Sequence, residues 1–144
     1  MLALLDPQDG QSCLEPAAGD GRFVDALLAT QKDLHITAVE LSPTAASQLL
    51  RRYASASAVR VLETDFLTLS SDLFQEIDLF DRVVANPPYG GWQDYPKRAL
   101  LKARFPDLYV RETYGLFLAR GLRRLTAGGR LVFIVPETFL YLHL

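Results

Sequence analysis

Short apolar runs alternate along the chain with stretches in which apolar residues recur every three or four positions. The apolar runs predict five strands, at 12–16, 35–41, 58–66, 79–86 and 130–136. The helical spacing occurs at 18–31, 44–54 and 113–126. Strands that alternate with helices in this way predict an α/β fold, with a mostly parallel sheet, right-handed crossovers and helices on both faces.

Local residues indicate where these elements begin and end. Ser42 followed by Pro43 is typical of a helix N-cap with proline at the first helical position. Gly128 and Gly129 predict the end of the helix at 113–126. The strand at 130–136 is apolar on both faces, which predicts a central position in the sheet. The residues expected to face inward are Phe23, Ala26, Leu27 and Thr30 in the first helix, and Leu116, Phe117, Ala119, Leu122 and Leu125 in the last.

Composition excludes several classes of protein. The 144 residues are enough for one domain with a core, and the net charge of −2 argues neither for nor against nucleic acid. Cys13 is the only cysteine, so the chain has no disulfide framework and no cysteine metal cluster, which suits the reducing cytoplasm. No apolar run is long enough to span a membrane. The apolar end "PETFLYLHL" indicates a piece of a longer protein or a surface that a partner covers.

A glycine-rich turn follows the first predicted strand, in "EPAAGDGRF" at 15–23. Gly19 and Gly21 allow the backbone to approach a ligand closely and to adopt φ angles that other residues disfavour. Glu40 ends the second strand about 20 residues further on, where nucleoside-binding sites place a carboxylate for the ribose hydroxyls. A tight turn without a ligand, with Glu40 as a helix cap or a solvated strand end, is the alternative interpretation.

Asp65 and Phe66 end the third predicted strand at the same edge of the sheet. The carboxylate can accept a hydrogen bond from an adenine amino group, and the ring can pack on the base; a helix cap is again the alternative. Together with Glu15, Asp20 and Glu40, Asp65 would repel phosphates. These charges favour S-adenosylmethionine, which combines adenine and ribose with an ammonium and a sulfonium.

The fourth predicted strand leaves through Asn86-Pro87-Pro88-Tyr89. Two adjacent prolines form a stiff turn, and we expect it to face the ligand, at the carboxyl edge of the sheet. The Asn86 oxygen and the Pro87 carbonyl can each accept one N6–H of an adenine, which returns electron density to the nitrogen lone pair with little reorganisation. Tyr89 offers a stacking face worth about 1–3 kcal/mol. The alternative is a rigid turn whose tyrosine packs on the core.

In this order, the motifs resemble those of the adenine-N6 DNA methyltransferases of restriction-modification systems, of the gamma type, in which the cofactor motif precedes the catalytic motif. The matching stretches are "LEPAAGDGRF", "VEL", "TDF", "ANPPYG" and "YGLFLARGLRRLTAGGRLVFIVPETFL". The resemblance implies a Rossmann-like class I S-adenosylmethionine-dependent fold and, as substrate, double-stranded DNA whose target base is flipped out. It implies no metal, adenine-holding residues Asn86, Pro87, Pro88 and Tyr89, and cofactor contacts from Glu15, Pro16, Ala17, Gly19, Gly21, Phe23, Glu40, Leu41, Asp65, Phe66 and Asn86.

Members of this family carry parts that do not fit in these residues. They have a segment before the first strand, a seven-stranded sheet, a further aromatic for the flipped base and a separate target-recognition domain. We therefore expect residues 1–144 to form a partial catalytic domain that works with a specificity domain or subunit and beside a cognate restriction endonuclease. A methyltransferase for ribosomal RNA bases or protein glutamine, and an inactive remnant or cofactor-binding module that needs a partner chain, remain open.

Basic and aromatic residues gather in the segment at 90–115. They could contact DNA phosphates, or they could form the solvated face of a helix at 96–104 that packs through Leu100, Leu101 and Phe105. The residues concerned are Trp92, Tyr95, Lys97, Arg98, Lys102, Arg104 and Arg111. On the helix at 113–126, Arg120, Arg123 and Arg124 are expected on the outer, solvated face.

Overall fold

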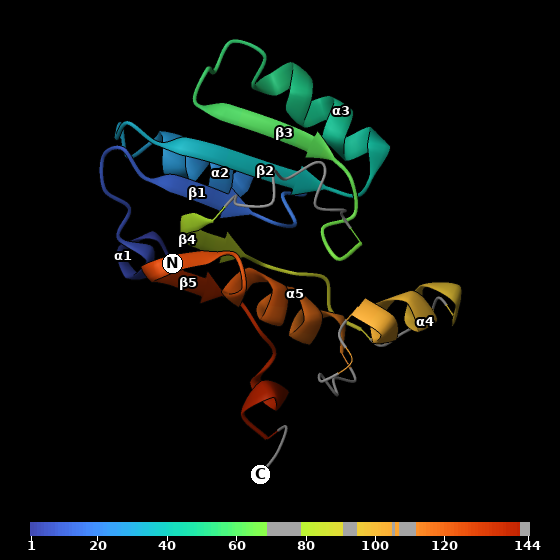
Figure 1. Cartoon of the computed structure of the whole chain (residues 1–144). Helices are drawn as coiled ribbons and strands as arrows, with labels where there is room; N and C mark the ends of the chain where they lie inside the picture. The colour runs from blue at the N-terminus through green and yellow to red at the C-terminus, as the bar shows by residue number, and fades with distance from the viewer. Residues whose placement is uncertain (69–78, 91–94, 105, 107–111, 142–144) are drawn as a thin grey trace.

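The computed structural model shows a five-stranded parallel sheet with the strand order β3-β2-β1-β4-β5 (Figure 1). It describes residues 1–68, 79–90, 95–104, 106 and 112–141, with only the backbone at 95–97 and 140–141. The strands are β1 (Ser12–Glu15), β2 (His35–Glu40), β3 (Val59–Glu63), β4 (Phe80–Ala85) and β5 (Leu125–Phe133). The helices are α1 (Leu2–Leu5), α2 (Arg22–Leu28), α3 (Pro43–Arg52), α4 (Tyr95–Arg104) and α5 (Thr113–Leu122), followed by the 3-10 helix η1 (Glu137–Tyr141). The predicted parallel α/β sheet is confirmed.

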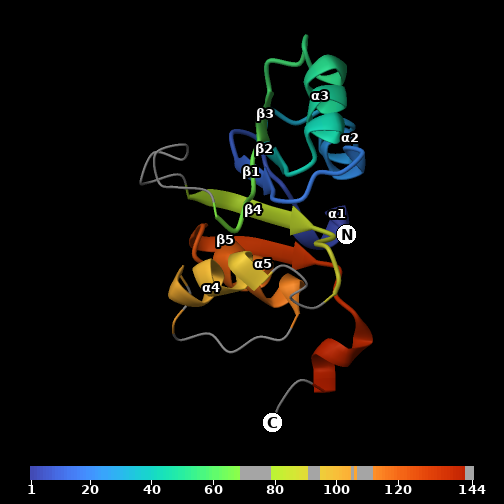
Figure 2. The ribbon, with the colours of Figure 1, turned by 90° about the vertical axis from the view of Figure 1, so that its right-hand side faces the viewer.

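Helices cover both faces of the sheet, as Figure 2 shows, with α2 and α3 on one face and α4 and α5 on the other. Successive strand residues point to opposite faces, and the core divides accordingly. Leu14 and Val83 pack with α4 and α5, whereas their neighbours Cys13 and Val84 pack with α1, α2 and α3. Within the described part of the chain, every helix is too short or too polar to cross a membrane.

The last helix and strand differ from the prediction. Helix α5 ends at Leu122, and Gly128 and Gly129 lie inside β5 rather than after the helix. The pairing passes from Phe80 with Leu125 to Arg82 with Arg130, so β5 is irregular here and has more residues than β4 across this step. Gly128, within that stretch, has a φ of 79°. Strand β5 was expected to be central, but within the described sheet it lies at the edge, paired with β4 alone.

Several side chains predicted to face inward lie elsewhere. On α2 the buried residues are Val24 and Leu27, while Phe23, Ala26 and Thr30 are only partly buried. On α5 the prediction holds for Leu116 and Phe117, but Leu122 is 55% exposed, and Leu125 belongs to β5. Buried positions on α5 also include Arg120, so its expected place on the solvated face was wrong.

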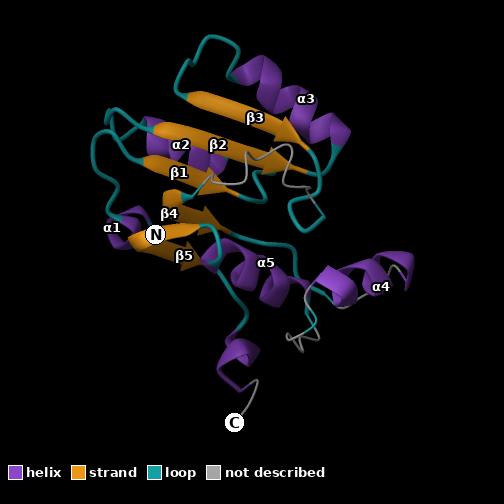
Figure 3. Ribbon diagram, in the orientation of Figure 1, coloured by secondary structure: helices purple, strands orange, loops and turns teal. Residues whose placement is uncertain are grey.

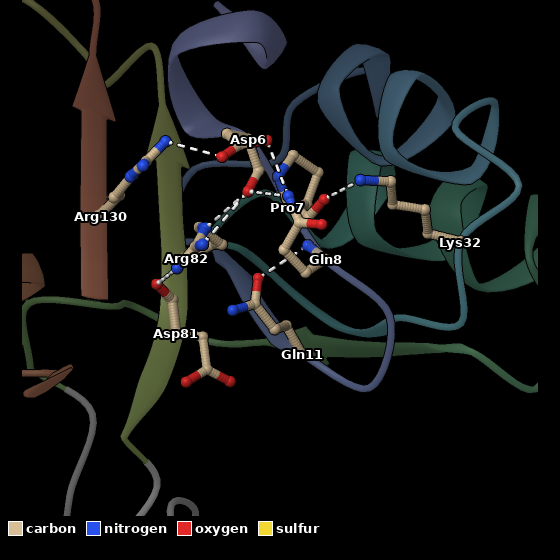
Figure 4. A network of polar contacts seen from close by, with 8 residues as sticks. All are labelled: Asp6, Pro7, Gln8, Gln11, Lys32, Asp81, Arg82 and Arg130. Carbon is tan, nitrogen blue, oxygen red and sulfur yellow. Dashed lines mark hydrogen bonds and ion pairs between the residues drawn. The ribbon is translucent and has the colours of Figure 1, made fainter. Parts of the chain in front are cut away.

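Polar groups at the amino edge of the sheet bond to one another (Figure 4). Arg82 of β4 is buried and donates to the backbone oxygens of Asp6, through Nε and Nη2 at 3.2 Å each, and of Asp81, through Nη1 at 2.8 Å. Arg130 of β5 reaches the Asp6 carboxylate at 3.1 Å. These contacts join the segment before β1 to β4 and β5.

Asp81 forms a second polar contact at this edge. Its carboxylate accepts the Ser12 backbone N–H and hydroxyl at 3.0 Å each, and the Thr126 hydroxyl at 3.1 Å. These bonds, the one from the Ser12 backbone first, lower the pKa of Asp81. Strands β1, β4 and β5 are thus joined where they start.

Candidate cofactor and catalytic site

The carboxyl ends of the strands meet along the opposite edge of the sheet, toward which the arrowheads in Figure 3 point. After β1 the glycine-rich turn crosses to the end of β2. The Gly19 N–H donates to Glu40 Oε2 at 2.7 Å, and the Ser42 N–H donates to Glu40 Oε1 at 2.7 Å. Glu40 therefore holds the turn and the start of α3 together, and each oxygen keeps a second lone pair for another donor.

The two glycines of the turn have different roles. Gly19 has a φ of 53° and faces open space, so a ligand can approach its backbone. Gly21 has a φ of 83°, and a Cβ there would lie 2.5 Å from the Tyr53 hydroxyl and 2.9 Å from Leu49. The sequence suggested ligand approach at both positions, whereas the structure shows that Gly21 is needed for the packing of α3. Ser42 caps α3 as predicted, with its side chain accepting from Ala45.

Glu15, the last residue of β1, is a buried carboxylate. Only 2% of its surface is exposed, and its Oε2 has no hydrogen-bond partner among the described residues. Burial raises the pKa of Glu15 to about 8, against the lowering effect of a bond from the Val24 backbone. A buried acceptor without a partner is costly in a native protein unless a ligand completes it.

Two neighbouring cavities lie along this edge of the sheet. One, of about 340 Å³, lies over the ends of β2 and β3 and is lined by Pro16, Ala17, Glu40, Leu41, Thr64, Asp65, Phe66, Leu67, Asn86, Pro88, Thr113 and Phe117. The other, of about 300 Å³, lies beside the glycine turn and is lined by Glu15, Ala17, Ala18, Gly19, Asp20, Arg22, Phe23, Asn86 and Ile134. Ala17 and Asn86 line both cavities. The structure thus brings the turn that begins at Asn86 and the glycine turn together.

The end of β3 forms a capped turn against the larger cavity. The Leu67 N–H donates to Asp65 Oδ1 at 2.9 Å, so Asp65 does act as a local cap, the alternative raised from the sequence, while it also lines the cavity. Phe66 borders the same cavity, but its ring lies in the core and packs on Phe117 with the centroids 5.5 Å apart.

Asn86 follows β4 with an exposed side chain, Pro87 is buried, and Pro88 is exposed. The Tyr89 ring is 51% exposed and stands edge-on to Tyr114, with centroids 6.4 Å apart. It therefore does not pack in the core as the alternative interpretation required. The Tyr89 hydroxyl donates to Asn86 Oδ1 at 2.5 Å, so the tyrosine and the amide of the motif contact each other.

Arg120 is the residue near the site that the sequence analysis misplaced. It is 6% exposed, its Nη1 donates to the Leu67 backbone oxygen at 2.6 Å, and its guanidinium lies 5.2 Å from the centre of the Phe66 ring. The burial of Arg120 could have been predicted from the sequence, because Arg120 follows Leu116 by four residues and Phe117 by three, which places it on the buried side of α5.

The basic segment is only partly described. On α4 Leu101 is buried and Leu100 is exposed, while Arg98, Lys102 and Arg104 are exposed. Arg104 donates to the Thr68 backbone oxygen at 2.5 Å. The predictions for Trp92, Tyr95, Lys97, Phe105 and Arg111 concern side chains outside the described residues.

The residues present fit S-adenosylmethionine. A buried carboxylate without a partner, Glu15, suits an ammonium group, and open backbone at Gly19 admits a ligand beside it. Glu40 and Asp65 line the neighbouring cavity, where ribose and adenine offer hydroxyl and amino donors. Leu41, also exposed at this cavity, and Pro16 add apolar surface. Asp20 and Arg22 pair with each other at the surface at 2.8 Å, so neither adds a buried charge.

Comparison with known proteins points the same way. Residues 30–143 match the family model described as Eco57I restriction-modification methylase. The chain is 32% identical over 155 residues to the Type II methyltransferase M.TthHB8I of Thermus thermophilus, covering 99% of this chain and 33% of that protein. It is 30% identical over 135 residues to the Type II methyltransferase M.AccI of Acinetobacter calcoaceticus, covering 90% of this chain and 24% of that protein. The chain thus spans about a quarter to a third of the length of these relatives.

A solved structure confirms the fold. The S-adenosylmethionine-dependent methyltransferase from Thiobacillus denitrificans, in complex with S-adenosyl-L-homocysteine, superposes with a TM-score of 0.60 at 18% identity. The match covers 91% of this chain and 44% of that one. The predicted Rossmann-like methyltransferase fold is therefore confirmed.

Proposed function

The chain belongs to the Eco57I restriction-modification methylase family, and we propose that it forms the catalytic core of an S-adenosylmethionine-dependent methyltransferase for the N6 amino group of adenine in double-stranded DNA. One observation carries the proposal: Asn86 lines both the cavity beside Glu15 and the cavity beside Asp65. A target base held at Asn86 is thereby adjacent to the cofactor that those cavities fit.

The two cavities hold different parts of the cofactor, the smaller one the ammonium end and the larger one the ribose and adenine. S-adenosylmethionine supplies an electrophilic methyl group when bound. Glu15 pairs with the ammonium group, and Glu40 accepts from the ribose hydroxyls. Asp65 accepts from the adenine amino group, and Phe66 borders the base. Ala17 lines both cavities, Pro16 lines the larger one and Gly19 lines the smaller one.

The motif that begins at Asn86 prepares the target base. The Asn86 oxygen and the Pro87 carbonyl each accept a hydrogen bond from one N6–H, which raises the electron density on the nitrogen. The turn is rigid because of the two prolines, so these acceptors need little reorganisation as charge develops. Tyr89 is half-exposed and offers a ring on which a flipped base stacks.

The remaining steps need parts outside these residues. The chain covers only 24% to 33% of its relatives, so target recognition falls to a further domain or a specificity subunit, with a cognate restriction endonuclease acting on the same site. The proposed activity is cytoplasmic, where DNA and the cofactor are both available. Cys13 takes no part, because burial raises the pKa of its thiol to about 11.

A transfer assay with S-adenosylmethionine labelled in the methyl group, run on these residues together with the target-recognition domain or subunit, tests the proposal on three substrates: duplex DNA, ribosomal RNA and a release-factor protein. We expect label in DNA, and N6-methyladenine after digestion to nucleosides. Label confined to RNA or to protein glutamine would replace the substrate. Calorimetry with S-adenosylhomocysteine, run in parallel, separates a cofactor-binding module without turnover from a chain that binds no cofactor.

A further inference from the structure

Arg120 is a buried cation that the proposed chemistry does not use. It lies on α5 among Leu116, Phe117 and Gly121, which are buried on the same side of the helix. Burial lowers the pKa of Arg120 to about 10, with smaller contributions from Arg104 and Arg124, so the guanidinium stays charged at neutral pH. Keeping an arginine charged in a core is costly unless its contacts compensate.

Arg120 contacts the turn that follows β3. Nη1 donates to the Leu67 backbone oxygen at 2.6 Å, and the planar group lies 5.2 Å from the centre of the Phe66 ring. Asp65, the first residue of this turn, is a smaller electrostatic influence that raises the pKa of Arg120. Direct contacts to Phe66 and Leu67 therefore tie the turn to one side chain, and the charge of Asp65 acts in the same direction.

The same turn faces the larger cavity from its other side, since Asp65, Phe66 and Leu67 all line it. Side chains that border a ligand must be held in place, because a hydrogen bond weakens steeply when its geometry is lost. Arginine suits this task, since its fork donates in fixed directions while its face stacks on an aromatic ring.

We propose that Arg120 is a positioning residue that fixes the turn at 65–67 so that Asp65 and Phe66 select adenine in the cofactor. This rests on the proposed function, because it assumes that the adenine of S-adenosylmethionine occupies the larger cavity. Arg120 itself touches neither the methyl group nor the target base. Loss of Arg120 should weaken the preference for adenine as the base of the cofactor and leave the transfer chemistry unchanged.

Calorimetry with two ligands measures that choice: S-adenosylhomocysteine, and its inosine counterpart, in which a carbonyl oxygen replaces the adenine amino group. The ratio is the dissociation constant of the inosine counterpart divided by that of S-adenosylhomocysteine, and it reports recognition of the amino group. We expect Arg120→Met to lower this ratio about tenfold, the size of one lost charge-assisted interaction. Arg120→Lys keeps the charge without the planar fork and should lower the ratio about threefold. In turnover, KM for the cofactor should rise while kcat at saturation stays within about threefold.

Two control variants separate positioning from stability. Arg82→Met removes a buried arginine at the opposite edge of the sheet, and Arg123→Met removes an exposed one just after α5. Both should keep the native ratio, even where Arg82→Met lowers the melting temperature. A native ratio in folded Arg120→Met, or in Arg120→Lys if the methionine variant does not fold, overturns the inference.

A further variant distinguishes failure of this inference from failure of the proposed function. Asp65→Asn should lower the ratio at least as much as Arg120→Met. The assignment of the cavity to adenine is wrong if the native protein binds neither ligand, or if Asp65→Asn keeps the ratio. In either case the proposed role of Arg120 is wrong too. If Asp65→Asn lowers the ratio and Arg120→Met does not, only the role of Arg120 is wrong.

Discussion

Arg82 and Glu15 are both buried charged residues on neighbouring strands, with 7% and 2% of their surfaces exposed, but they lie at opposite edges of the sheet. At the amino edge Arg82 donates to two backbone oxygens. At the carboxyl edge Glu15 has an oxygen without a partner among the described residues. At the amino edge Arg82 is thus bonded within the protein, whereas at the carboxyl edge Glu15 Oε2 is left as an acceptor for a ligand.

The difference distinguishes two uses of a buried polar group. A fully bonded group stabilises the fold, and its removal leaves its partners unsatisfied. An unbonded group destabilises the free protein, so it persists where a ligand completes it. Substitutions at the amino edge should therefore change stability without changing binding, and those at the carboxyl edge should change binding or turnover.

Replacing Asn86 should have the largest effect. Asn86→Ala removes the side-chain acceptor for the target nitrogen and should reduce methyl transfer by a factor of about a thousand, as loss of one preorganised transition-state bond does. Binding of S-adenosylhomocysteine should stay within about tenfold, since Asn86 only borders the cofactor cavities. Labelled-methyl transfer and calorimetry measure the two quantities. Gln11→Ala, an amide removed at the amino edge, serves as the control, and unchanged turnover in Asn86→Ala would take Asn86 out of the mechanism.

Arg82→Met should have the next largest effect, on stability alone. It leaves the Asp6 and Asp81 backbone oxygens without their donor, which we expect to cost about 2–3 kcal/mol of unfolding free energy. Urea unfolding measures the loss. Arg130→Met, which removes a half-exposed partner of Asp6, should cost about 0.5 kcal/mol. Equal losses in the two variants would mean that burial of Arg82 is unimportant.

Glu15→Gln should have opposite effects on stability and on binding. In the folded protein the pKa of Glu15 is raised from 4.5 to about 8, so the folded state keeps a proton that the unfolded state releases in this window. Unfolding free energy therefore falls as pH rises from about 4.5 to about 8. A neutral glutamine avoids that loss, and the variant should melt at a higher temperature than the native protein at pH 9.

The same variant should bind S-adenosylhomocysteine about tenfold more weakly at pH 9, because the charged partner of the ammonium is gone. Native binding should strengthen as pH rises through about 8, and that dependence should disappear in Glu15→Gln. Calorimetry across this range checks it, with the exposed Glu63→Gln as control. Equal binding in Glu15→Gln and the native protein would place the ammonium elsewhere.

Asp81→Asn should have the smallest effect. The lowered pKa of Asp81 means that its contribution to stability is present above the ordinary aspartate range and is lost as pH falls through the lower, folded value. The variant should cost about 1 kcal/mol at pH 7. In urea unfolding the difference from the native protein should shrink at pH 3, and a difference that grows in acid would contradict the assignment.

The sequence was sufficient for the parts of the fold that depend on local patterns. Strand β2 is a short apolar run, and helix α3 starts with a clear cap at Ser42 and Pro43. Their predicted positions agree with the structure to within two residues. The grouping of the residues after β1, β2, β3 and β4 could be predicted because parallel strands place their carboxyl ends at one edge. Their meeting at shared cavities confirms this arrangement, while their individual roles remain predictions.

The errors came from tertiary context that single residues do not encode. Gly128 with Gly129 looks like a helix end, but the pair lies in the irregular stretch of β5, because the positive φ of Gly128 suits either use. The need for glycine at position 21 depends on Tyr53, far away in the sequence. Arg120 was assigned to the surface by residue type, although its spacing from Leu116 and Phe117 pointed inward.

The hydrogen bond from the Tyr89 hydroxyl to Asn86 has a consequence for how a base enters. Before a base binds, the phenol already donates to the amide oxygen that the proposed function assigns to an adenine N6–H. An amide oxygen has two lone pairs, so it can keep the tyrosine hydroxyl as one donor and accept the base as a second. The hydroxyl would then fix the orientation of the amide, so that its remaining lone pair is aimed before the base arrives.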